Sequence, residues 1–107
     1  EVDTGSIYFQ NSFVLNGAEL SDEIRNIQGL QILKIIKKFL IKYPKVKSKK
    51  QIGKGNFNKR RYPKDSQLDV NKTIKKQFNL LRINNNKLYP SFFYFKGHKY
   101  IIKIFKE

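Results

Sequence analysis

The sequence predicts an α+β domain in which N-terminal helices pack on a C-terminal antiparallel sheet of three to four strands. Apolar residues recur at steps of three and four between residues 20 and 43, and again from 70 to 81, which is the spacing of a helical face. After residue 78, aromatic and β-branched runs alternate with turn residues, which is typical of an antiparallel meander. With 107 residues, of which 39% are hydrophobic, the chain fits a single domain over residues 1–107.

The first half of the chain predicts an extended segment followed by a helix. Residues 1–15 contain strand-type residues with a polar break and predict an extended arm or an edge strand. Asn16, with Glu19 three residues later, has the spacing of a capping box and predicts the start of the helix. Gly29 allows that helix to divide in two, and Pro44 ends it.

The second half predicts a basic loop, a second helix and the strands. Residues 44–64 have no periodicity, so we expect a loop. Ser66 and Asp69 repeat the capping pattern and predict a helix over about 67–78. Strands follow in NLLRI, LYPSFFYF and HKYIIKIF, with a two-residue turn at Lys96-Gly97 or Gly97-His98. We expect one core to hold apolar residues of both halves: Leu33, Ile36, Leu40, Ile74, Phe78, Phe93, Ile102 and Ile104.

The charge is large and unevenly distributed. The formal net charge is +15, yet residues 1–24 contain five acids and no base, and residues 25–107 contain all 23 bases and three acids. A surplus of this size favours a polyanionic partner, which is nucleic acid, an anionic membrane or an acidic protein. No apolar run is long enough to cross a bilayer, so we expect no membrane insertion. The chain lacks Met, and we therefore expect it to be a fragment or a processed product.

Residues 45–64, called the basic segment from here on, predict a nucleic-acid surface. They contain nine bases and no acid, and Phe57 and Tyr62 lie between the bases. Phosphates bind spaced cations, and aromatic rings stack on unpaired bases. The alternative is a solvated surface loop. The predicted nucleic-acid-binding residues are Lys45, Lys47, Lys49, Lys50, Lys54, Phe57, Lys59, Lys64 and, outside the segment, Lys99.

The ionisable residues leave few routes for catalysis. The chain has no Cys, a single His and only three acids after residue 24, so we expect no metal site and no cofactor. Metal-free RNA cleavage requires a base for the 2′-OH, cations for the phosphorane and an acid for the leaving oxygen. The candidate set is His98, Tyr100, Arg60, Arg61 and Tyr62. We expect the basic segment to fold across the sheet and to bring Arg60 or Arg61 near His98 or Tyr100.

The order of two helices, a basic connection and a C-terminal antiparallel sheet resembles the small ribonuclease toxins of the barnase/colicin/RelE type. The segment FYFKGHKYIIKI is similar to the hairpin of HigB-type members, and His98-Lys99-Tyr100 matches their polar-Lys-Tyr corner. Where the family often has Arg after that Tyr, this chain has Ile101. The resemblance implies a metal-independent ribonuclease toxin domain that acts on RNA in the cytoplasm, with tRNA as one candidate.

The missing Met also fits the C-terminal toxin of a contact-dependent inhibition system, delivered from a larger secreted or surface protein. An acidic immunity or antitoxin protein would then be its partner. Two alternatives stay open at this point. One is a non-catalytic module that binds DNA or RNA, and the other is a basic domain that binds an acidic protein.

Overall fold

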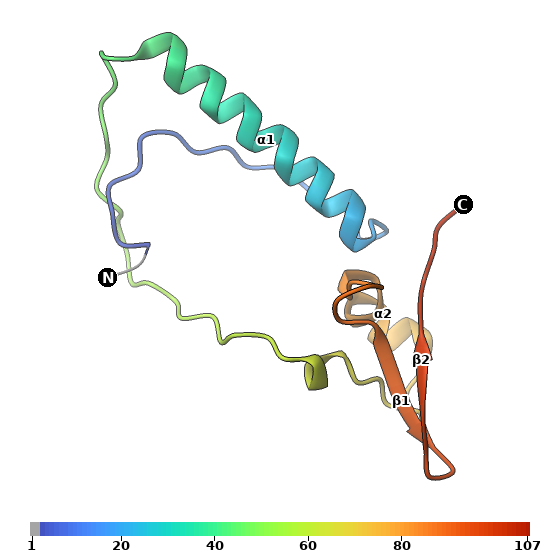
Figure 1. Ribbon diagram of the computed structural model, residues 1–107. Coiled ribbons are helices and arrows are strands. Elements are labelled where there is room, and N and C mark those ends of the chain that lie inside the picture. Colours follow the sequence, from blue (N-terminus) through green and yellow to red (C-terminus); the bar gives the residue numbers. More distant parts are fainter. Residues whose placement is uncertain (1–2) are drawn as a thin grey trace. The chain divides into compact units, whose positions relative to one another are not determined.

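A computed structural model describes residues 3–107 of the chain (Figure 1). In chain order, the elements are α1 (Ser21–Lys42), the 3₁₀ helix η1 (Pro63–Ser66), α2 (Ile74–Ile83), β1 (Ser91–Phe95) and β2 (His98–Ile102). The two α-helices and the antiparallel strand pair confirm the α+β class. Over the described residues the sheet has two strands, so the expectation of three to four strands is wrong.

The described chain divides into two compact units. The first contains the residues up to Val14 together with Asn26–Asn58, and the second contains Leu15–Arg25 together with Lys59–Glu107. The basic segment therefore contributes to both units.

In the first unit, the N-terminal arm pairs with the chain that follows α1. Ile7 and Lys49 form an isolated antiparallel bridge with two backbone hydrogen bonds of 2.8 and 2.7 Å. The ring of Phe39 makes edge contacts with Tyr8 and Phe9 at centroid distances of 5.9 and 6.4 Å. The described part of the predicted 1–15 segment is thus an extended arm, and residues 1 and 2 lie outside the described residues.

Helix α1 begins one turn later than the sequence pattern predicts. The Glu19 carboxylate does accept a hydrogen bond from the Asn16 N–H at 2.7 Å, but this closes a turn before the helix. The Glu23 carboxylate accepts from the Leu20 N–H at 2.8 Å and satisfies a donor at the true start. The helix then runs without interruption through Gly29, because its 22 residues otherwise favour helix.

The second helix also begins later than predicted. Ser66 ends η1 instead of capping a helix, and Thr73 caps α2 by accepting a hydrogen bond from the Lys76 N–H at 3.3 Å. As a result, α2 includes the residues 79–83 that the sequence analysis assigns to a strand. The Arg82 Nε donates a hydrogen bond of 2.8 Å to the Asn79 Oδ1, since side chains three residues apart are neighbours on a helix.

The strands form one hairpin, as predicted for the last two runs. Ser91 pairs with Ile102 at its open end, and Phe95 pairs with His98 next to the turn. The turn residues Lys96 and Gly97 both have positive φ, 49° and 76°, as a two-residue I′ turn requires.

The apolar core lies in the second unit and is small. Its buried apolar side chains are Leu20, Leu68, Leu81 and Phe92. The expectation that both halves share a core is wrong for Leu33, Ile36, Leu40 and Ile74, which are 63%, 48%, 68% and 70% exposed. The helical period correctly identifies which residues share an apolar face of a helix. A sheet of two short strands, however, has too little surface to bury such a face. The other four expected core residues, Phe78, Phe93, Ile102 and Ile104, are partly buried.

Candidate nucleic-acid interface

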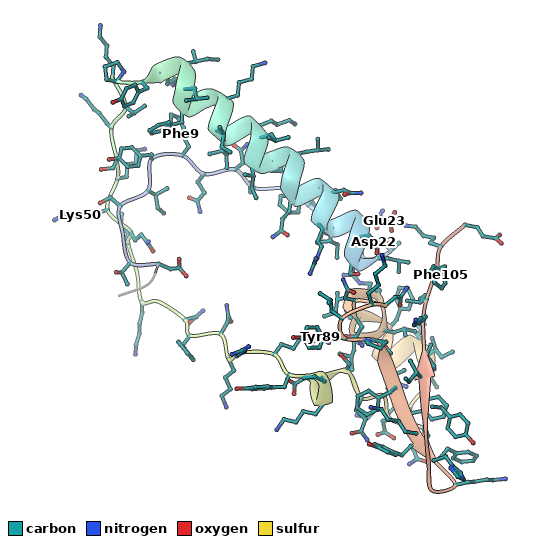
Figure 2. The ribbon with its side chains drawn as sticks, in the orientation of Figure 1. Phe9, Asp22, Glu23, Lys50, Tyr89 and Phe105 are labelled. Carbon is teal, nitrogen blue, oxygen red and sulfur yellow. The ribbon has the colours of Figure 1, made fainter. Side chains whose placement is uncertain are left out.

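The basic segment is an extended chain that is held at its ends. In the first unit, Lys49 pairs with Ile7, and the Gln51 amide donates hydrogen bonds to the carbonyl oxygens of Asp3 and Gly5 at 2.9 and 2.8 Å. Residues 51–60 are all exposed, and no helix or strand is assigned between Gln51 and Tyr62. Figure 2 shows side chains of this segment, Lys50 among them, extending outward from the backbone.

The predicted nucleic-acid-binding residues are accessible to a ligand. All nine predicted nucleic-acid-binding residues are exposed: Lys45, Lys47, Lys49, Lys50, Lys54, Phe57, Lys59, Lys64 and Lys99. Phe57 is 93% exposed, although an aromatic ring normally loses most of its contact with water on folding. The Arg60 guanidinium lies 5.9 Å from the ring centroid of Tyr62, which is itself 51% exposed. Cations and aromatic faces are therefore presented side by side.

Among the nine bases of the basic segment, Arg61 alone is not fully exposed, because its guanidinium packs within the second unit. Its Nη2 donates hydrogen bonds to the Asn84 Oδ1 and to the Ser66 Oγ. Asn84 in turn donates from Nδ2 to the Ser91 Oγ at 2.6 Å, and the Ser66 hydroxyl bonds the Tyr89 carbonyl oxygen at 3.2 Å. We call Arg61, Ser66, Asn84 and Ser91 the polar cluster.

The polar cluster is a buried junction between distant segments. Ser66, Asn84 and Ser91 are 0%, 3% and 1% exposed. The cluster joins the end of the basic segment, the end of α2 and the start of β1. The Arg61 Nε is also buried and has no hydrogen-bond acceptor among the described residues. Because the Arg61 guanidinium donates hydrogen bonds to the buried side chains of Ser66 and Asn84, we assign Arg61 a structural role.

His98 and Tyr100 lie on the hairpin, away from the polar cluster. Both are exposed, and as alternate residues of β2 they project from the same face of the hairpin. Arg61 is linked through Asn84 to Ser91, at the opposite end of β1 from the residue that pairs with His98. Four residue steps of strand separate those ends, about 13 Å. The structure therefore does not bring Arg61 to His98.

The five candidate catalytic residues thus occupy three places. Arg60 and Tyr62 contact each other in the basic segment, Arg61 belongs to the polar cluster, and His98 and Tyr100 share a hairpin face. Among the described residues, no group of three or more His, Asp and Glu side chains gathers as metal ligands would.

Two acids of the N-terminal region pair with bases of the C-terminal half. The carboxylate of Glu23 lies 2.7 Å from the Lys106 Nζ, and that of Glu19 lies 3.7 Å from the Arg82 Nη1 (Glu23 is labelled in Figure 2). The hydrogen bond from Lys106 lowers the pKa of Glu23, and the backbone N–H of Asn16 lowers that of Glu19. Glu19 and Glu23 therefore pair with bases that lie outside the basic segment.

Sequence reasoning missed the polar cluster. Ser66 is expected to cap a helix, Asn84 to lie in a turn, and Ser91 to lie within the strand LYPSFFYF. The available signal is that Asn84 and Ser91 directly flank apolar residues of α2 and β1, where a small polar side chain is easily buried.

Within the part of the chain that the structure describes, no helix is long and apolar enough to cross a membrane. Comparison with protein-family models, with curated proteins and with solved structures finds no match to this chain.

Proposed function

We propose that this chain binds RNA and that the basic segment holds the phosphate backbone. The observation that supports this most is an acid-free run of nine bases, of which all but Arg61 are exposed. A solvated loop would gain from alternating charges, since like charges repel along an extended chain. Phosphates would remove that repulsion and release their counterions on binding.

The salt dependence of RNA binding tests this proposal. Each phosphate contact with a single strand contributes a slope of about −0.7 to log K against log salt. Replacing Lys54, Lys59 and Arg60 by Ala should therefore make the slope shallower by about 2 units. These three side chains are exposed, and Arg61 is kept because it is structural.

The matched control replaces Lys34, Lys37 and Lys38 by Ala. These lysines are exposed on α1, and their replacement removes the same charge as the first triple variant. We expect its slope to stay much closer to that of the unmodified chain. Equal changes in both triple variants would mean that net charge alone governs binding. An unchanged slope in the first variant would mean that the basic segment is a solvated loop that does not bind phosphates.

A second candidate function is metal-independent RNA cleavage, as in the toxin domains that the hairpin resembles. It is favoured by one observation: His98 and Tyr100 are exposed on the same hairpin face, and Lys96 lies in the turn two residues before His98. An imidazole can take the 2′-OH proton and a phenol can protonate a leaving oxygen, while a cation stabilises the phosphorane. In this candidate the basic segment binds the substrate, and tRNA and an acidic immunity protein are the substrate and partner to test.

Incubation of the chain with total RNA in EDTA separates the two functions. Discrete fragments would support cleavage if the rate at which they form falls at least about a hundredfold in His98→Ala. Lys103→Ala, a change of an exposed residue just beyond β2, is the control. Intact RNA together with a gel shift would leave binding as the function.

A further inference from the structure

The free end of the hairpin keeps aromatic surface in contact with water. Tyr94 is 54% exposed, whereas Phe92, two residues earlier on the same face of β1, is 7% exposed. The two rings meet edge to face at a centroid distance of 5.9 Å. Tyr94 is therefore held by a buried neighbour on one side and presents the rest of its surface outward.

A hollow lies beside this ring. It has a volume of about 330 Å³ and is lined by Gln67, Leu68, Asp69, Val70 and Tyr94. The segment that lines it is fixed to the hairpin, because the Leu68 N–H donates to the Phe92 carbonyl oxygen at 2.7 Å. The hollow thus combines an aromatic face, an aliphatic wall and the polar side chains of Gln67 and Asp69. That combination suits a planar heteroaromatic ring with polar edges.

The surroundings are cationic. Lys99 pairs with Tyr94 across the strands, and its Nζ lies 4.2 Å from the Phe92 ring centroid. The acid of the lining, Asp69, has its carboxylate 3.7 Å from the Lys72 Nζ, and the sequence has no further acid before Glu107. A second copy of this chain would bring the same positive charge to this surface, which disfavours self-association.

We propose that this surface, formed by Tyr94, Lys99 and the hollow, binds one unpaired nucleotide of single-stranded RNA. The base stacks on Tyr94 in the hollow, and Lys99 holds an adjoining phosphate. Unpaired bases are required because a duplex hides the faces of its bases and offers only their edges. The inference rests on the proposed RNA binding and adds a base-dependent contact to a phosphate-dependent one.

The experiment compares two probes of equal charge, an eight-nucleotide oligo(U) and an abasic oligomer with the same number of phosphates. Tyr94→Leu, which keeps an apolar side chain but removes the ring, should weaken oligo(U) binding about 5- to 150-fold. It should leave binding of the abasic oligomer unchanged. Tyr94→Phe should retain oligo(U) binding, and Lys99→Ala should weaken the binding of both probes.

Phe105→Leu is the matched control, because Phe105 is 81% exposed and lies outside the strands. The nucleotide site would be overturned if Tyr94→Leu weakened the binding of both probes equally, or weakened the binding of neither. If salt-dependent binding of both probes persists in that case, the basic segment still binds RNA. If the unmodified chain binds neither probe, both proposals fail.

Discussion

Asn84→Ala tests whether the polar cluster holds the second unit together. The Asn84 side chain is 3% exposed and makes three hydrogen bonds, accepting from Arg61 and Ser66 and donating to Ser91. Alanine removes all three. The Ser66 hydroxyl keeps its bond to the Tyr89 carbonyl oxygen, so its loss is partly compensated.

The expected cost follows from the groups that are left without partners. The Ser91 hydroxyl stays buried without its 2.6 Å bond, and an unsatisfied buried polar group costs about 1–3 kcal/mol. The Arg61 guanidinium loses its Asn84 acceptor, which adds about 1 kcal/mol for a partly exposed donor. We therefore expect the free energy of unfolding to fall by about 3 kcal/mol.

Urea denaturation measures this free energy, followed by far-ultraviolet circular dichroism and by tyrosine fluorescence, since the chain has six Tyr and no Trp. Asn71→Ala is the control, because Asn71 is exposed and should change stability by less than about 0.5 kcal/mol. If Asn84→Ala is as harmless as the control, the polar cluster does not stabilise the fold. Arg61 would then have no structural role and would belong to the candidate interface with Arg60.

Three other predictions concern pH, the hairpin turn and α1. The hydrogen bond from Lys106 lowers the pKa of Glu23 from its ordinary value of 4.5. The contribution of Glu23 to stability is therefore complete well above pH 4.5 and is lost as the pH falls below that value. Glu23→Gln should make the stability depend less on pH in that range. Gly97→Ala should destabilise the hairpin by about 1 kcal/mol or more because φ is 76°, whereas Gly55→Ala should not, which thermal unfolding can compare. Phe39→Ala should lower the melting temperature through lost ring contacts, and Leu40→Ala, 68% exposed, should leave it nearly unchanged.

Local patterns predicted local structure well. The Lys96-Gly97 turn depends on positive φ at adjacent residues, and glycine at the second of them marks it in the sequence. The stretch from Ser21 to Lys42 has helix-forming residues, acids first and lysines last, and it forms one helix. By contrast, NLLRI fits a strand or a helix equally by composition. Such short apolar runs are decided by what they pack against, and Leu81 is buried in the helix that forms.

The candidate interface was predictable in one part and not in another. The sequence alone determines that residues 45–64 are basic and acid-free, because charge is a property of the residue types and needs no fold. Only the tertiary structure decides that Arg61 turns into a buried cluster while Arg60 stays exposed, since the acceptors Ser66 and Asn84 are 5 and 23 residues away. It likewise decides that Tyr94 borders a hollow and Phe92 is buried, because burial depends on which distant segment, here Leu68, lies against the strand.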